Sequence, residues 1–309
     1  MSSAVSLRGL TKRFGNLTVV EGLDLEIEAG IVFGFLGLNG AGKTTTIRML
    51  TGLSKPTAGE ASILGHRIGQ RNPRAHELFG YLPESPSFYP WMKAHELLRW
   101  IGRLRGLSPQ ASRQEAARLL DELGLGKASG RRIGGFSRGM RQRLGLAVAM
   151  TARPPLLILD EPGSALDPVG RAELLQIVRR LRGAATIFFS SHILAEVERV
   201  VDAVGILHHG RLLVVATRDE LDARLPHSIF LLQIEGNAEP LVARLESLPG
   251  VTAVERGEAI RVHTRDPDLA KRELPRAVAE LGLPLVRFEL VRPTLEDVFL
   301  RVVQPEVPT

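Results

Sequence analysis

The fold of this chain is decided by Gly37-Leu38-Asn39-Gly40-Ala41-Gly42-Lys43-Thr44-Thr45, which fits the pattern G-x-x-x-x-G-K-[ST]. The apolar run Ile31 to Leu36 comes directly before this stretch, and we expect Thr45 to Leu50 to form the helix that follows. The order is therefore a buried strand, a glycine loop and a helix. Such a loop closes backbone N–H groups around phosphate oxygens, and the helix N-terminus adds partial positive charge.

Two side chains of this loop have separate expected roles. Lys43 can reach the β- and γ-phosphates of a nucleotide, and the Thr44 hydroxyl can bind Mg²⁺. A glycine-rich turn without nucleotide is the alternative interpretation, which the strand–loop–helix context disfavours. The residues predicted to bind nucleotide here are Gly37, Asn39, Gly40, Ala41, Gly42, Lys43, Thr44 and Thr45.

A second motif, Leu156-Leu157-Ile158-Leu159-Asp160-Glu161, is an apolar strand that ends in two carboxylates. Because successive strand residues point to opposite sides, we expect the two to do different work. Asp160 would coordinate Mg²⁺ through water, and Glu161 would polarise an attacking water. The alternative is a buried strand whose acidic end enters a turn at Pro162-Gly163.

His192 follows the apolar strand Ala185 to Phe189. Parallel sheets bind ligands beyond the carboxyl ends of their strands, so this histidine can hydrogen-bond a γ-phosphate. A lone histidine is more often structural, and the prediction rests on its position.

The amino-acid composition narrows the class of protein. The 309 residues are 44% hydrophobic, enough for one large core and a smaller domain. With no cysteine, the chain has no disulfide, no thiol catalysis and no cysteine-ligated zinc, which fits a reducing cytosol. Met1 to Gly15 has no apolar segment typical of a signal peptide, and no apolar run approaches the roughly 18–20 residues of a membrane span. We therefore expect any membrane role to use the helices of a partner.

The net charge is +6, and a basic chain is one indication of a surface that binds nucleic acid. The basic residues are scattered, and segments such as Arg179-Arg180-Leu181-Arg182 alternate with apolar positions as on a solvated helix face. We expect no direct nucleic-acid binding.

Between the two nucleotide motifs lies Phe136-Ser137-Arg138-Gly139-Met140-Arg141-Gln142-Arg143. Here the chain resembles the ATP-binding subunits of ATP-binding cassette (ABC) transporters, whose signature is usually LSGGQ before a basic helix. Ser137 and Gly139 keep the two main positions. Further matches are Ser164-Ala165-Leu166-Asp167, which looks like the D-loop, His192 as the switch histidine, and Phe14 where the family places an adenine-stacking aromatic. The resemblance covers about residues 3–220.

The resemblance implies roles for these residues. ATP and Mg²⁺ are the expected cofactors, with Lys43, Glu161 and His192 catalytic. Thr44, Asp160 and Glu84 would bind the Mg²⁺ ion. Glu84, in Gly80-Tyr81-Leu82-Pro83-Glu84, stands where the family carries the Q-loop glutamine, and Leu38 stands where it often has proline. A carboxylate can hold a metal or water but cannot donate as an amide does.

The resemblance also implies partners. Two such domains pair head to tail, so that Ser137, Arg138, Gly139 and Met140 of one copy close over the ATP of the other and Asp167 lies at the interface. The chain shows no internal repeat of the cassette, so we expect a second copy, most simply a homodimer, and an integral membrane permease. The expected location is the cytoplasmic face of the membrane, as a peripheral subunit.

The expected fold is α/β: an ABC cassette over residues 1–222, with a mainly parallel sheet, an antiparallel β subdomain and a helical subdomain inserted at about 86–150. Residues 226–309 are expected to alternate as strand–helix–strand–strand–helix–strand. This order predicts a small ferredoxin-like α+β domain. Pro275 is expected to start or kink the second helix. The ending Pro293 to Leu300, with Thr294 as helix cap, resembles that of drug- and polysaccharide-type ABC-2 exporters.

An aromatic cluster follows Glu84: Phe88, Tyr89, Trp91 and Met92. One interpretation is the core of the helical subdomain. The other is a groove for a short helix of a membrane subunit, because interface anchors favour such residues, and the two are compatible.

Three functions compete. The first is the ATPase subunit of an ABC transporter, and the ending favours an exporter. The second is a soluble ABC-type ATPase that acts on ribosomes or nucleic acid, and the third is a nucleotide-sensing scaffold without catalysis. The single cassette, the lack of a long heptad run and the intact Lys43, Asp160, Glu161 and His192 favour the first.

Overall fold

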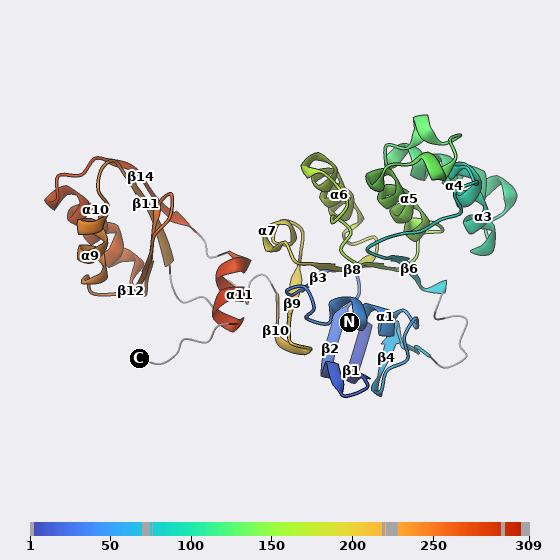
Figure 1. The fold of residues 1–309 in the computed structure, drawn as a ribbon, viewed down its shortest axis with the longest axis horizontal. Helices are drawn as coiled ribbons and strands as arrows, with labels where there is room; N and C mark the ends of the chain where they lie inside the picture. The colour runs from blue at the N-terminus through green and yellow to red at the C-terminus, as the bar shows by residue number, and fades with distance from the viewer. Residues whose placement is uncertain are drawn as a thin grey trace. The chain divides into compact units, whose positions relative to one another are not determined.

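A computed structural model describes residues 3–69, 75, 77–217, 220, 228–291 and 294–303. The chain divides into two compact units, Met1–Thr217 and Arg218–Thr309, each with its own hydrophobic core (Figure 1). The boundary expected at 222–226 lies outside the described residues.

The first unit is built on a sheet with the strand order β10-β9-β3-β8-β7-β6. Neighbouring strands are parallel except for β10, which is antiparallel to β9. The strands at its centre are buried along their whole length, which explains their continuous apolar sequences. The strands are β3 (Val32–Leu36), β6 (Phe79–Leu82), β7 (Leu156–Leu159), β8 (Thr186–Ser191), β9 (Ala203–His208) and β10 (Arg211–Thr217).

A second, antiparallel sheet has the order β2-β1-β4-β5. Its strands are β1 (Ser3–Phe14), β2 (Leu17–Glu28), β4 (Ala58–Ile63) and β5 (His66–Arg67). Along β2, Leu23, Leu25 and Ile27 are buried while the acidic residues between them are exposed. This alternation is typical of a sheet with one face in the core and one in water.

Helices connect and cover these sheets. Between β6 and β7 lies the predicted helical subdomain, with α3 (Ala94–Leu104), α4 (Pro109–Glu122), the short 3₁₀ segments η1 (Gly126–Ala128) and η2 (Ile133–Gly135), and α5 (Arg138–Met150). Ser108 caps α4 by accepting from the Ala111 N–H at 3.1 Å. The other helices of this unit include α1 (Lys43–Leu50), α6 (Pro168–Leu181) and α7 (Leu194–Val197).

The second unit has an antiparallel sheet of order β12-β13-β11-β14. The elements are β11 (Ser228–Ile234), α9 (Glu239–Glu246), β12 (Val251–Glu255), β13 (Ile260–Thr264), α10 (Pro267–Glu280), β14 (Leu285–Val291) and α11 (Leu295–Val303). The succession β11 to β14 confirms the predicted ferredoxin-like order.

Two details of this unit test the sequence interpretation. Pro275 does not start the second helix: it lies inside α10, which begins with Pro267 after the cap Asp266. Thr294 caps α11 as expected: its Oγ1 accepts from the Asp297 N–H at 3.3 Å, and in return its own N–H donates to Asp297 Oδ2 at 2.7 Å. In the core, Phe230 stacks on Phe288 with ring centroids 5.2 Å apart.

Candidate nucleotide site

Glycine is required at two points of the loop between β3 and α1. A Cβ on Gly37 would lie 2.4 Å from the Leu207 carbonyl oxygen. Gly42 has a φ of 108° and its Cβ would lie 2.9 Å from the Val19 carbonyl oxygen. Helix α1 begins directly after it at Lys43, two residues before the expected start at Thr45. The backbone therefore turns sharply and presents the first turn of α1 to the end of the sheet.

A cavity of about 390 Å³ lies over this turn. It brings together most of the predicted loop residues with Glu84, Glu161 and His192, which come from distant parts of the chain. Val19 was not predicted. The lining residues are Val19, Leu38, Asn39, Gly40, Gly42, Lys43, Thr44, Thr45, Glu84, Glu161 and His192. Backbone N–H groups at a helix start and a lysine make this cavity suitable for phosphate.

Lys43 is 5% exposed, and protein oxygens surround its ammonium group. Nζ donates to the carbonyl oxygens of Gly37 and Leu38, at 2.6 and 3.3 Å. It also lies 3.2 Å from Glu161 Oε1. The cation that is predicted to meet phosphate is thus paired with a carboxylate in this structure.

Asp160 lies beneath the cavity and is 1% exposed. Its Oδ1 accepts hydrogen bonds from Ser190 Oγ at 2.8 Å and Thr44 Oγ1 at 3.2 Å. Burial raises the pKa of Asp160, against the lowering effect of these two hydrogen bonds, and the carboxylates of Glu161 and Glu84 raise it further.

Asp160 Oδ2 is buried and has no hydrogen-bond partner among the described residues. An orphaned carboxylate oxygen beside a threonine hydroxyl fits Mg²⁺, which takes one or two protein oxygens and completes its shell with water and phosphate. In the described part of the chain, no three His, Asp or Glu side chains form a cage that would hold a metal without such help.

Glu161 has a φ of +48°, in the left-handed region. Its N–H donates to Ser190 Oγ at 2.9 Å, and its Oε2 lies 2.8 Å from His192 Nδ1. The two carboxylates do face different partners, but strand alternation is not the reason, because β7 ends at Leu159. The left-handed turn at Glu161 separates them.

Sequence reasoning missed Ser190. Its hydroxyl donates to the Asp160 carboxylate and accepts from the backbone N–H of Glu161, so one side chain holds the first carboxylate and the backbone of the second residue. The signal that could have found it is its place: it lies at the carboxyl end of β8, where Phe35 is its partner in β3.

The remaining predicted residues do not line this cavity. Ser137 caps α5 by accepting from the Met140 N–H at 3.2 Å, and Asp167 caps α6 by accepting from the Gly170 N–H at 2.7 Å. Phe14 ends β1 and is 56% exposed, with Lys12 Nζ 4.9 Å from its ring centroid. Gly37, Ala41 and Asp160 are also outside the lining, and Arg138 and Gly139 lie in the first turn of α5.

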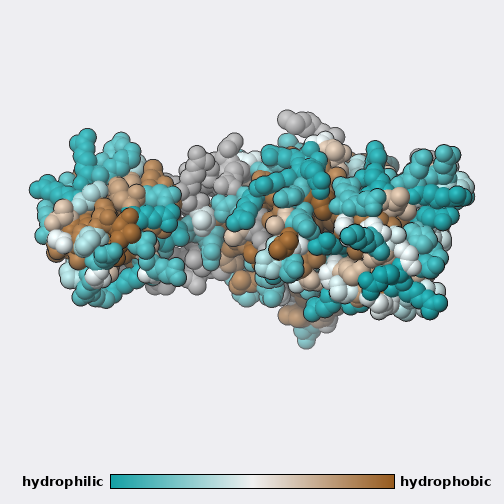
Figure 2. Space-filling view, turned by 90° about the horizontal axis from the view of Figure 1, so that it is seen from above, coloured by the Kyte–Doolittle hydropathy of each residue, from teal (hydrophilic) through white to brown (hydrophobic). Residues whose placement is uncertain are grey.

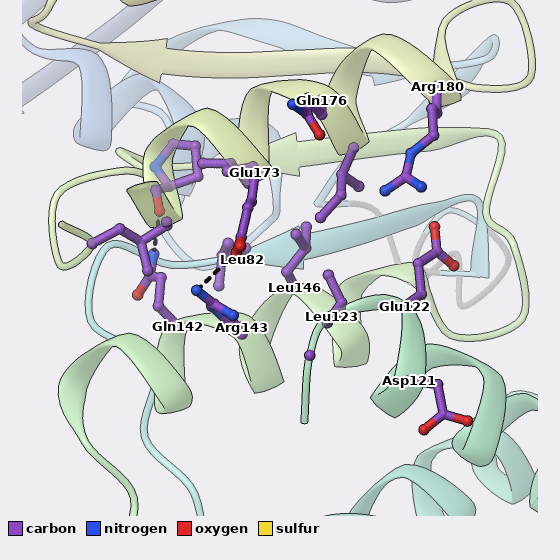
Figure 3. Close-up of a pocket in the computed structure, with 16 residues that line it drawn as sticks. Leu82, Asp121, Glu122, Leu123, Gln142, Arg143, Leu146, Glu173, Gln176 and Arg180 are labelled. Atoms are coloured by element: carbon purple, nitrogen blue, oxygen red, sulfur yellow. Dashed lines mark hydrogen bonds and ion pairs between the residues drawn. The ribbon is translucent and has the colours of Figure 1, made fainter. Parts of the chain in front are cut away.

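A second cavity, of about 270 Å³, lies between α5, α6 and the end of α4. Figure 3 shows Arg143 and Glu173 pointing toward one another across it, with an ion pair of 2.9 Å. Beside them, Gln142 Nε2 donates to the Pro162 carbonyl oxygen at 3.1 Å. The ion pair ties α5 to α6, and the hydrogen bond ties α5 to Pro162, which directly follows Glu161.

The fold and the site define an NTPase of the P-loop class: a parallel sheet, a glycine loop at a helix start, and an acidic strand end beside it. Comparison with known proteins specifies the family. The family described as "ABC transporter" matches residues 20–164, and that described as "ATP-binding protein DrrA1-3-like, C-terminal domain" matches residues 217–303.

Similar proteins span the whole chain. The uncharacterized ABC transporter ATP-binding protein YxlF of Bacillus subtilis is 39% identical, over 97% of this chain and 99% of its own length. The bacitracin transport ATP-binding protein BcrA of Bacillus licheniformis is 36% identical, over 98% of both chains. A solved structure of the ATP-binding subunit of an ABC transporter has a TM-score of 0.67 at 33% identity, and covers 72% of this chain and 92% of that one.

The chain therefore belongs to the ABC transporter family, as an ATP-binding subunit. It is an ATPase, and its nucleotide is ATP. Among the described residues, no helix is both long and apolar enough to cross a membrane.

Proposed function

We propose that this subunit hydrolyses ATP as a head-to-tail pair and so drives export through a separate membrane permease, from the cytoplasmic face of the membrane. The observation that carries the proposal is the full-length similarity to a transport ATP-binding protein, together with a cavity that holds a lysine, a glutamate and a histidine within contact of one another. The cargo is a property of the permease and is not part of the proposal.

Each residue around the cavity has a proposed role. Lys43 and the N–H groups of the glycine loop hold the phosphates, and Phe14 stacks on adenine. Thr44 and Asp160 hold Mg²⁺, with Glu84 beside them, and the bound metal would neutralise charge on the transferring phosphate. Glu161 takes a proton from the attacking water, while His192 orients Glu161 and contacts the γ-phosphate.

The signature supports pairing because it lies away from its own cavity. Ser137 to Met140 begin α5, and the partial positive charge at a helix start attracts an anion such as a γ-phosphate. We assign Ser137, Arg138, Gly139 and Met140 to the nucleotide of a second copy, and Asp167 to the contact between the copies.

The permease contact is assigned to an aromatic patch made of Tyr89, Trp91 and Trp100. The patch is exposed at 49%, 66% and 45%, so the alternative that the aromatic cluster is buried core is wrong for Tyr89 and Trp91. Tyr89 lies with its ring centroid 5.1 Å from that of Trp91 and 6.5 Å from that of Trp100. Exposed aromatic residues in contact with one another are typical of interface anchors.

The test is a pull-down from solubilised native membranes with tagged Glu161→Gln protein and ATP, followed by mass spectrometry. We expect a polytopic membrane protein to co-purify, and to be lost when Lys43→Ala is used as the control that cannot hold nucleotide. Recovery of only ribosomal or soluble partners would favour the soluble ATPase instead.

A further inference from the structure

Strand β14 forms an open edge of the second unit. In the part of the chain that the structure describes, β14 pairs with β11 alone. Alternate N–H and C=O groups of such an edge point outward and are available to another strand. Figure 2 shows hydrophobic residues gathered at the surface of this unit. On β14 itself, Leu285, Val286 and Leu290 are 39%, 55% and 50% exposed.

The sequence of β14, Leu285-Val286-Arg287-Phe288-Glu289-Leu290-Val291, has an internal symmetry about Phe288. An apolar residue lies two positions, and again three positions, to either side of Phe288. One position away, the positive Arg287 on one side corresponds to the negative Glu289 on the other. Within a single chain, Arg287 Nε donates to Glu289 Oε2 at 2.9 Å, so these charges already form a neutral pair on one face of the strand.

We propose that β14 pairs antiparallel with β14 of a second copy of this chain, on a two-fold axis at Phe288. In that register each Arg287 lies opposite the Glu289 of the partner, and Val286, at which the pairing of β14 with β11 shifts by one residue, lies opposite Leu290. Opposite residues in an antiparallel pair share a face, so both ion pairs and both apolar contacts form together. The two four-stranded sheets then join into one continuous sheet.

The charges select both this partner and this register. A shift of the two-fold axis by one residue position along the strand sets Arg287 against Arg287 or Glu289 against Glu289, and like charges directly opposite are destabilising. A shift by half that amount brings together residues of opposite faces. Only the arrangement centred on Phe288 matches charge with opposite charge and apolar with apolar. This interface involves no nucleotide residue, so pairing through β14 does not depend on ATP.

The first experiment measures self-association of the full-length protein by sedimentation without nucleotide. Arg287→Glu and Glu289→Arg should each weaken the dimer by about tenfold or more in Kd, because each replaces two attractive pairs with two repulsive ones. An equimolar mixture of the two variants should restore a dimer, since each strand again faces opposite charges. Arg256→Glu, a charge reversal at a surface ion pair near the other end of the unit's sheet, is the matched control and should leave association unchanged.

The mixture distinguishes the proposal from a structural effect. The internal Arg287–Glu289 pair remains broken in both variants, so only contact between chains can account for recovery. A monomeric wild-type protein, a dimer unaffected by both reversals, or a mixture that stays monomeric would each overturn the proposal.

The second experiment fixes the register, since the chain has no native cysteine. The double variant Val286→Cys, Leu290→Cys places two thiols opposite each other, with Cβ atoms about 4.5–5.5 Å apart, and should form a covalent dimer under mild oxidation. Each single variant leaves its like thiols about 13 Å apart and should not cross-link. Equal cross-linking of single and double variants would show random collision and overturn the register.

Discussion

Glu161 Oε2 lies 2.8 Å from His192 Nδ1, and this contact joins two segments that are 31 positions apart in the chain. The histidine fixes one oxygen of the carboxylate, and Lys43 lies 3.2 Å from the other. A carboxylate held from both sides keeps one orientation toward the cavity. The contact with His192 is the one that can orient Glu161 toward an attacking water, because Lys43 is also the group expected to bind phosphate.

Glu161→Gln should bind ATP and lose turnover, because an amide keeps the shape of the side chain but cannot accept a proton. General-base catalysis is worth about 10²–10⁴-fold, so phosphate release should fall by that factor while nucleotide binding is retained. The ATP-bound pair should then accumulate in size-exclusion chromatography. Undiminished phosphate release would refute the role given to Glu161.

Ser190→Ala should lower both stability and turnover. It removes the hydroxyl that donates to Asp160 and accepts from Glu161, and leaves a buried carboxylate with one hydrogen bond fewer. The free energy of unfolding should fall by about 1–3 kcal/mol in denaturant titration. Ser191→Ala is the matched control, since Ser191 Oγ accepts only a local hydrogen bond from the Ile193 N–H. Equal effects of the two substitutions would contradict the special role of Ser190.

Asp160→Asn should make the nucleotide-free protein more resistant to unfolding at neutral pH. Because the folded state raises the pKa of Asp160, the folded protein binds this proton more readily than the unfolded chain does. The contribution of Asp160 to stability is therefore complete below the ordinary pKa of an aspartate and is lost as pH rises through the raised value.

The check is the difference in Tm between Asp160→Asn and wild type across pH, which cancels the contributions of the other carboxylates. It should be largest near neutral pH and shrink as the solution becomes acidic, while Mg²⁺-dependent turnover is lost at all pH values. A difference that grows toward acid would mean that the pKa is lowered instead.

Tyr89→Asp should weaken the complex with the permease and spare ATP binding, because it places a charge in the centre of the aromatic patch. Leu53→Asp, at a residue 66% exposed on another part of the cassette, is the control. Co-purification from membranes measures the first property and nucleotide titration the second. A complex that survives Tyr89→Asp would remove the patch from the interface.

Much of the fold followed from local patterns. The buried strands β3, β7 and β8 are short continuous apolar runs, and their parallel arrangement was expected from the strand–helix alternation. The ferredoxin-like order also followed from strand and helix periods. The exact start of α1 could not be predicted in this way. It depends on the left-handed conformation of Gly42, and a glycine in a sequence allows this conformation without indicating that it is adopted.

Most residues of the site could be predicted from the sequence, but the contacts between them could not. Motifs identified Lys43, Asp160, Glu161 and His192, yet their contacts depend on which strand ends are neighbours. Ser190 was missed for this reason, since a serine at a strand end has no distinctive pattern until β8 is placed beside β3 and β7. The positive φ of Glu161 could not be predicted from the sequence either, because the surrounding structure determines it.

The contact between Lys43 and Glu161 also bears on how the site empties and refills. Glu161 Oε1 neutralises the buried ammonium of Lys43, as a phosphate oxygen would, so a phosphate that reaches this lysine competes with the carboxylate. Nucleotide entry is thus an exchange of one anion for another. Part of the attraction between lysine and phosphate is offset by the contact that must be given up, which moderates affinity and eases the departure of the spent nucleotide.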